Sequence, residues 1–90
     1  MKTGNTKVDT VNGLTVVRLY STDIVMFNKD RITLNTGGYY SNTTKDRMNA
    51  ASQDFSLGYK VFQKNRVWGV DYKGKTHLFG TDNKVTLERG

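Results

Sequence analysis

The chain has 90 residues, enough for one domain with a modest hydrophobic core but too few for two. It has no cysteine, which excludes disulfide bonds and thiolate metal sites, and no apolar run near the roughly 18 to 20 residues of a membrane-spanning helix. Lysine and arginine number 14 against 8 aspartate and glutamate residues. The resulting net charge of +6 favours an acidic partner, nucleic acid first, although a basic surface also serves solubility.

The first residues, MKTGNTKVDT, are polar and lack the apolar core of a signal peptide. We therefore expect a flexible N-terminal segment over residues 1–12 and an intracellular location. Residues 13–90 contain no repeat and no low-complexity block, and we expect them to form a single domain.

Short runs of β-branched and aromatic residues at 16–19 and 24–27 predict two strands. Residues 28–31, Asn-Lys-Asp-Arg, have turn chemistry because asparagine and aspartate tolerate left-handed backbone. Ile32 and Leu34 then alternate with polar residues, which is typical of a half-buried strand.

The period changes in the middle of the chain. Met48, Ala51 and Phe55 have the i, i+3, i+7 spacing of one helix face, and we predict a helix over about 44–56. Thr43 and Asp46 have the spacing of a capping box at its start, and a glycine at position 58 suits its end.

Alternating patterns return after the helix. The runs 59–63 and 67–72 flank Lys64-Asn65, and the runs 70–72 and 76–79 flank Lys73-Gly74, so both pairs are candidate hairpins. A last strand is expected at 84–87. The pattern predicts an α+β fold, an antiparallel meander of about six short strands with the helix packed on one face. The alternative is a small open SH3-like barrel with an inserted helix.

The sequence offers little for catalysis. His77 is the only histidine, and a lone strand histidine is more often a surface side chain than a metal ligand. The acidic residues are scattered over turns and caps, and neither a phosphate-binding loop nor a dinucleotide fingerprint is present. We expect no enzyme activity, no cofactor and no metal.

The junction 37–47, where a strand leads into the helix, gathers flexible backbone and exposed aromatics. Gly37 and Gly38 permit positive φ, either for a simple bend or for close approach to another group. Tyr39 and Tyr40 are consecutive, so we expect one to pack and the other to be exposed. Tyr40 is the better candidate for stacking on a base.

Thr43 and Thr44 offer hydroxyls at the start of the predicted helix, where free amides and the helix dipole favour an anion. Lys45 and Arg47 have the wrong sign for that dipole. Either an anion lies near them, or both side chains point into water, where salt screens the repulsion.

A second basic stretch, the hairpin region 60–75, supports the same interpretation. In an extended hairpin Lys60, Phe62 and Lys64 share one face. Interleaved cations and aromatics are a common way to hold single-stranded nucleic acid. Trp68 is expected in the core, because a small domain needs its large side chains inside. The predicted nucleic-acid-binding residues are Tyr40, Thr43, Thr44, Lys45, Arg47, Lys60, Lys64 and Arg66.

Two segments, ITLNTGGYYSNTTKDRMN and VFQKNRVWGVDYKGK, resemble a group of small, mostly uncharacterised phage and prophage proteins. Their pattern is a Gly-rich turn, an aromatic residue, T-T-K-x-R-[MLI]-N, and then a VFQK…W hairpin; the resemblance covers about residues 24–72, with a Tyr-Tyr pair where one aromatic is usual. The matching positions are Leu34, Gly37, Gly38, Tyr40, Thr43, Thr44, Lys45, Arg47, Met48, Asn49, Phe62, Gln63, Lys64 and Trp68.

The resemblance implies a viral origin, and hence the host cytoplasm as location, but no activity. Two functions stay open. The first is a non-catalytic module that binds nucleic acid without sequence specificity, since no reader motif appears. The second is a phage modulator that binds an acidic surface of a host protein through the same face. A homodimer formed by an exposed sheet edge is also possible, and no membrane partner is expected.

Overall fold

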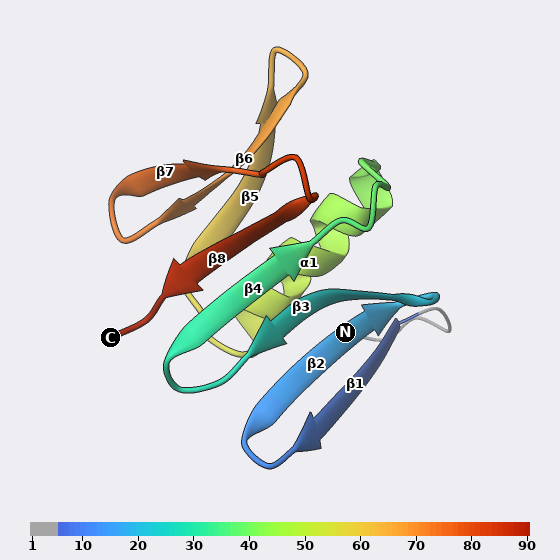
Figure 1. Ribbon diagram of the computed structural model, residues 1–90, viewed down its shortest axis with the longest axis vertical. Coiled ribbons are helices and arrows are strands. Elements are labelled where there is room, and N and C mark those ends of the chain that lie inside the picture. The colour runs from blue at the N-terminus through green and yellow to red at the C-terminus, as the bar shows by residue number, and fades with distance from the viewer. Residues whose placement is uncertain (1–5) are drawn as a thin grey trace.

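The computed structural model describes residues 6–90 as eight strands and one helix (Figure 1). The predicted α+β class is confirmed, and the sheets are open. The elements are β1 Thr6–Val11, β2 Leu14–Leu19, β3 Thr22–Phe27, β4 Arg31–Asn35, α1 Asn42–Asp54, β5 Tyr59–Lys64, β6 Val67–Tyr72, β7 Lys75–Leu78 and β8 Lys84–Glu88.

The strands form two antiparallel sheets, where the sequence indicated one meander. The first sheet has the order β1-β2-β3-β4-β8 and the second the order β5-β6-β7. After β4 the chain leaves the first sheet, forms α1 and the whole second sheet, and returns as β8 beside β4, with Arg31 opposite Glu88. The second sheet is therefore an excursion between two neighbouring strands of the first.

The prediction of a flexible segment over residues 1–12 is wrong for residues 6–11, which form β1. This strand pairs with β2 from Thr6 opposite Leu19 to Val11 opposite Leu14. Its sequence is polar because it is an edge strand, nearly all of it exposed, and its partner rather than a core supplies the stabilising hydrogen bonds. Residues 1–5 lie outside the described part of the chain.

The helix starts two residues earlier than predicted. Ser41 is its N-cap, and the Ser41 side chain accepts a hydrogen bond from the Thr44 amide at 3.2 Å, so the predicted capping box of Thr43 and Asp46 is wrong. At the other end Ser56 has φ +54°, and the Leu57 amide donates to the Ser52 carbonyl at 2.8 Å. This is the Schellman arrangement, with serine rather than glycine in the left-handed position.

The helix joins the two sheets. It packs against β5 of the second sheet and against β3 and β2 of the first. Its fully buried side chains, Met48 and Ala51, meet a core that both sheets supply, including Val17, Leu34 and Val70. In Figure 1 the helix lies behind the first sheet, and its N-terminal end approaches the second.

Two helix side chains complete the backbone hydrogen bonds at the free edge of β5. The Asn49 amide group accepts from the Val61 N–H at 2.7 Å and donates to the Val61 carbonyl at 3.0 Å. The Ser52 hydroxyl donates to the Tyr59 carbonyl at 2.7 Å and accepts from the Tyr59 N–H at 3.0 Å. Side chains thus replace a neighbouring strand, which fixes α1 against the second sheet.

Two-residue turns with both residues at positive φ, the type I′ geometry, close three hairpins. They are Asn12-Gly13, Asn65-Arg66 and Lys73-Gly74. The second turn lies one residue later than the predicted Lys64-Asn65. It puts Arg66 at φ +65°, a position that glycine or asparagine usually fills.

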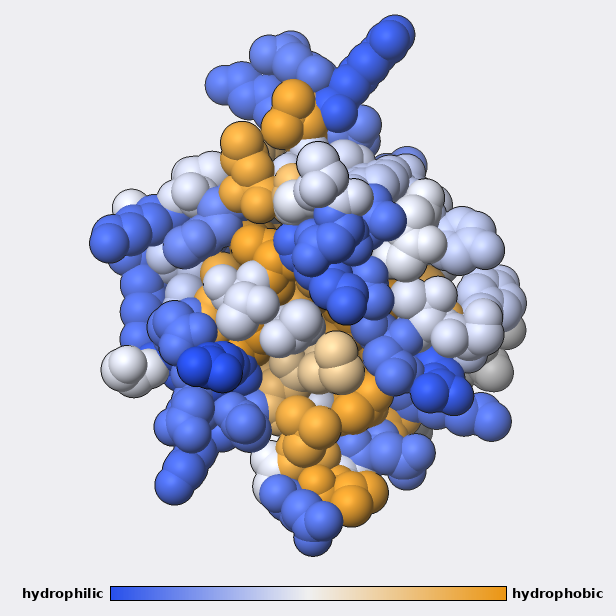
Figure 2. All heavy atoms as spheres, in the orientation of Figure 1, coloured by the Kyte–Doolittle hydropathy of each residue, from blue (hydrophilic) through white to orange (hydrophobic). Residues whose placement is uncertain are grey.

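The exposed side of the sheets carries apolar side chains between polar ones. Figure 2 shows them as a band from the second sheet at the top to the β1–β2 hairpin at the bottom, flanked by hydrophilic side chains. The exposed large apolar residues of the described chain include Val11, Leu14, Val67 and Leu78. The residues that the structure describes include no helix long and apolar enough to cross a membrane.

Candidate functional site

Three aromatic side chains from distant parts of the chain form a cluster at the N-terminal end of α1. The ring of Tyr40 stands edge-on to Trp68, with centroids 5.2 Å apart. Phe79 lies 6.2 Å from Trp68 and 6.5 Å from Tyr40, again edge-on to both. The Tyr40 hydroxyl donates to Asn83 Oδ1 at 2.8 Å, which fixes the orientation of its ring. Trp68 is 5% exposed and Tyr40 is 44% exposed, so Tyr40 carries the accessible aromatic surface.

This cluster borders a cleft of about 420 Å³, which we call the Tyr40–Trp68 cleft. Two cations belong to it. Lys45 Nζ lies 6.0 Å from the centre of the Trp68 ring, within the range of a cation–π interaction, and Arg66 lines the opening. Neither cation has an ion-pair partner among residues 6–90. The residues that line the cleft are Tyr40, Gln63, Arg66, Val67, Trp68 and Phe79.

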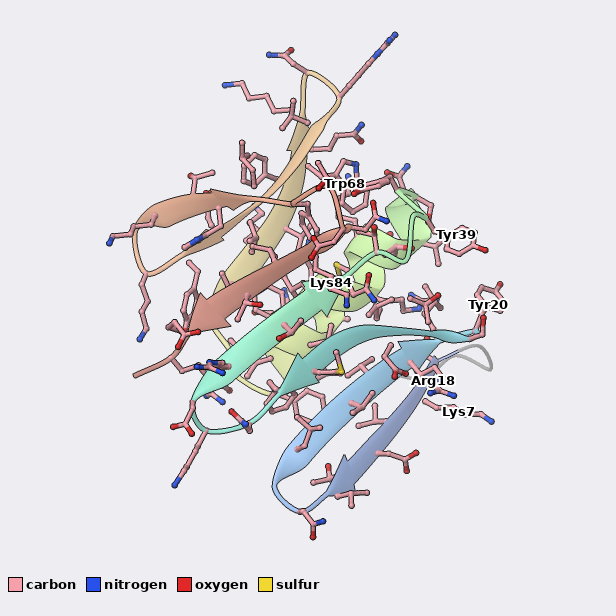
Figure 3. The ribbon with its side chains drawn as sticks, viewed as in Figure 1. Lys7, Arg18, Tyr20, Tyr39, Trp68 and Lys84 are labelled. Atoms are coloured by element: carbon pink, nitrogen blue, oxygen red, sulfur yellow. The ribbon has the colours of Figure 1, made fainter. Side chains whose placement is uncertain are left out.

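The indole N–H of Trp68 has no hydrogen-bond partner in the described part of the chain, although it is buried. An unpaired buried donor costs about 1–3 kcal/mol, and such groups are uncommon in folded proteins. Figure 3 shows Trp68 between the second sheet and the N-terminal end of α1. The Trp68 indole N–H is therefore a buried donor that residues 6–90 leave unused.

The glycine pair before the helix behaves as predicted, with φ +64° at Gly37 and +89° at Gly38. Gly37 also permits a close approach, because a Cβ atom there would lie 2.8 Å from the Cγ2 atom of Thr22. The approached group is a side chain of β3. The pair thus anchors the junction and positions Tyr39 and Tyr40.

The consecutive tyrosines serve different surfaces. Tyr40 packs into the aromatic cluster, whereas Tyr39 is 68% exposed and lines a second cleft of about 370 Å³ together with Tyr20. We call this the Tyr20–Tyr39 cleft. The expectation that one tyrosine packs and the other is exposed is correct, with Tyr39 the more exposed of the two.

The structure brings together only part of the predicted site. Lys45 lies 6.0 Å from the centre of the Trp68 ring, and Tyr40 and Arg66 line the same cleft as Trp68. Thr43 lines the Tyr20–Tyr39 cleft, and Thr44 is 2% exposed, where its amide and hydroxyl both bond to the N-cap Ser41.

The remaining predicted cations lie elsewhere. Arg47 is half-buried, and its Nε atom is buried without a described partner, so it does not point freely into water. Lys60 and Lys64 alternate with the buried Tyr59 and Val61 on β5. As predicted they share the outer face of the second sheet with Phe62, which is the opposite face from Trp68. The predicted residues thus do not form one continuous surface.

Sequence reasoning left two aromatic residues of the clefts, Phe79 and Tyr20, without a functional role. Phe79 belongs to the predicted hairpin strand 76–79, whose register sets it opposite Trp68, but it was not assigned to the site. Tyr20 could have been noticed from the sequence, because it lies between two predicted strands, where a short turn requires unusual backbone dihedral angles. Trp68 was correctly expected in the core, and it also forms a wall of the cleft.

Two ionisable side chains outside these clefts, Tyr59 and Arg18, have raised pKa values. Burial raises the pKa of the Tyr59 hydroxyl, which donates to the Met48 carbonyl. Asp23 lies 2.7 Å from Arg18 and raises the pKa of that guanidinium by hydrogen bonding and charge. Within residues 6–90 no three histidine or acidic side chains gather as metal ligands.

Comparison with known proteins gives a family. The model of the family described as Kyanoviridae Gp96 protein matches residues 1–86. No curated protein and no solved structure matches the chain. Kyanoviridae are phages, so the predicted phage origin is confirmed. The TTKxR[MLI]N and VFQK…W motifs that suggested it stay a prediction. The chain therefore belongs to the Kyanoviridae Gp96 family of phage proteins.

Proposed function

We propose that this phage protein is a non-catalytic accessory protein of the host cytoplasm that binds single-stranded nucleic acid without sequence specificity. The observation that carries the proposal is the Tyr40–Trp68 cleft, which the exposed Tyr40 ring and Arg66 line and beside which Lys45 lies over Trp68, neither cation having an acidic partner among residues 6–90. Proteins that hold single strands combine these elements: aromatic rings stack on bases, and cations attract the phosphate backbone.

In this proposal Tyr40 is the stacking surface. The Tyr40 hydroxyl bonds to Asn83, and the Tyr40 ring packs in a T-shaped arrangement with Trp68. Because the ring is already fixed, little conformational freedom is lost when a base stacks on it. Such stacking contributes about 1–3 kcal/mol for each base.

Lys45 and Arg66 are the proposed phosphate contacts. Both lack a described acidic partner, so both charges are available to a ligand. Lys60 and Lys64, on the opposite face of the second sheet, contribute long-range attraction rather than direct contact. The cleft also contains neutral Gln63, and we assign it no sequence-reading role.

Fluorescence anisotropy with labelled single- and double-stranded oligonucleotides tests the proposal between about 50 and 200 mM salt. We expect preference for the single strand and a steep loss of affinity with salt, because each neutralised phosphate releases counterion. The Lys45→Ala variant should lower the salt slope by about one, whereas Lys29→Ala, an exposed lysine in the β3–β4 turn, should change it less.

Failure to bind either oligonucleotide at the lowest salt would refute the proposal. In that event the alternative function, binding of an acidic host-protein surface, becomes the better one. A pull-down from host lysate treated with nuclease separates the two. A specific host protein that Lys45→Ala releases would favour modulation of that protein, and loss of every partner after nuclease would favour nucleic acid.

A further inference from the structure

We propose that the Tyr20–Tyr39 cleft is a second subsite, which takes a nucleobase from the same single strand. This inference rests on the proposed function and names the ligand class of a site that the sequence did not predict. The cleft has a volume of about 370 Å³, within the usual range for small-molecule sites. It lies between the β2–β3 turn, the loop after β4 and the start of α1.

Two exposed aromatic side chains border the cleft. Tyr20 is 69% exposed and Tyr39 is 68% exposed, and Figure 3 shows both projecting from the same side of the molecule. Tyr20 has φ +54°, and a bulky residue in that region is a true conformational outlier. This backbone belongs to the two-residue turn between β2 and β3, which places the Tyr20 side chain beside the cleft.

The lining of the cleft identifies the chemistry of the ligand. Buried Leu19 and Ile24 supply an apolar surface, and none of the lining residues within 6–90 is charged. The hydroxyls of Ser21, Thr22 and Thr43 have no hydrogen-bond partner among the residues that the structure describes. A neutral, flat group with polar edges matches this lining, and a phosphate does not. Because a hydroxyl both donates and accepts, all four bases find partners, in line with binding that ignores sequence.

The two clefts are adjacent along the chain. Tyr39 lines one and Tyr40 lines the other, so the loop that carries them separates two neighbouring stacking surfaces. The loop is closed by a hydrogen bond of 3.0 Å from the Tyr39 amide to the Thr36 carbonyl. A single strand that crosses this loop would place one base on each side of it.

The test uses labelled oligothymidylate of about 12 nucleotides and the variants Tyr39→Ala, Tyr39→Phe and Tyr40→Ala, with Leu78→Ala as an exposed apolar control outside both clefts. Thermal unfolding confirms that each variant is folded. We expect Tyr39→Ala to weaken binding by roughly 5- to 150-fold, as the loss of one stacked base implies, and Tyr39→Phe to restore most of it. Leu78→Ala should bind as the unmodified protein does.

The salt dependence gives a second readout. Because Tyr39 is neutral and the described lining of the Tyr20–Tyr39 cleft carries no charge, Tyr39→Ala should lower affinity equally at every salt concentration and leave the slope unchanged. If Tyr40→Ala weakens binding while Tyr39→Ala does not, the second subsite is wrong and the proposed function stands. A changed slope in Tyr39→Ala would also overturn the subsite. Absence of any binding by the unmodified protein would overturn both.

Discussion

The ring of Tyr40 meets Trp68 edge-on, with 5.2 Å between the ring centroids and 81° between the ring planes. Tyr40 lies in the loop between β4 and α1, whereas Trp68 lies in β6 of the second sheet. Edge-to-face packing of this kind contributes about 0.5–1.5 kcal/mol beyond the buried area. The contact therefore joins the loop to the second sheet and shapes the cleft at the same time. Trp68 is also the only tryptophan, so its fluorescence reports on this one place.

Arg66 combines a strained backbone with a proposed binding role, and the variant Arg66→Gly separates the two. Glycine after Asn65 gives the preferred pair for a type I′ turn, so we expect the free energy of unfolding to rise by about 0.5–1 kcal/mol. Loss of the charge should weaken oligonucleotide binding and lower the salt slope by about one. Urea unfolding measures the gain in stability, and fluorescence anisotropy measures the loss of affinity.

If Arg66→Gly stabilises the fold and leaves affinity unchanged, Arg66 has no binding role and its place in the turn is unexplained. A destabilised variant would instead mean that the arginine side chain makes packing contacts that outweigh the backbone strain.

Gly37 is expected to be the least replaceable glycine of the loop. Gly37→Ala places a Cβ atom 2.8 Å from the stiff, β-branched side chain of Thr22 and requires alanine at φ +64°. Gly13→Ala is the matched control, because φ is +81° there but nothing lies within 4 Å of the new atom. We expect Gly13→Ala to cost about 1 kcal/mol of stability and Gly37→Ala about 1–3 kcal/mol more, measured by urea unfolding. Equal losses would show that Thr22 moves aside freely.

Most strands were predictable because their signal is local. Alternation and β-branched residues located every strand but β1, whose polar sequence reflects an edge position that only the partner strand explains. The division into two sheets was not predictable. It depends on Asn49 and Ser52 filling the edge of β5, and nothing in the sequence marks those side chains as hydrogen-bonding to a strand.

The site was predictable only where neighbours in sequence are neighbours in space. Tyr40 and Lys45 belong to the same junction, so the prediction placed them together. Alternation correctly put Lys60 on one face of its strand, but the sequence could not show that Trp68, on the other face, would lie beside Lys45 of the helix. Phe79 joined the cluster through pairing of β7 with β6, the hairpin predicted around Lys73-Gly74, but the sequence could not show that Tyr40 would meet the same two rings.

Asn49 should contribute more to stability than its half-buried position suggests. Asn49→Ala leaves the N–H and the carbonyl of Val61 without partners, and we expect a loss of about 2 kcal/mol in the free energy of unfolding. Gln53→Ala, an exposed position on the same helix, is the control and should change stability by less than about 0.5 kcal/mol. Because the freed edge of β5 can pair with another chain, Asn49→Ala should also associate at high concentration, which light scattering detects.

Tyr59 makes stability depend on alkaline pH. Burial raises its pKa above the value of about 10 for a free tyrosine, so the folded state holds this proton more tightly than the unfolded state does. The resulting stabilisation is complete below about pH 10 and is lost as the pH rises toward the folded-state pKa, by up to about 1.4 kcal/mol per pH unit. Tyr59→Phe removes this dependence and also the hydrogen bond to the Met48 carbonyl, which costs about 1 kcal/mol at neutral pH.

The difference between the two proteins isolates this group, because every other ionisable side chain is present in both. Urea unfolding from pH 7 to about pH 11 should show Tyr59→Phe less stable at neutral pH, with a gap that closes above pH 10. A gap that stays constant across this range would mean that Tyr59 ionises equally easily in the folded and unfolded chains. Since the buried hydroxyl is fixed beneath α1, such a result would imply that the helix detaches from β5 before the protein unfolds.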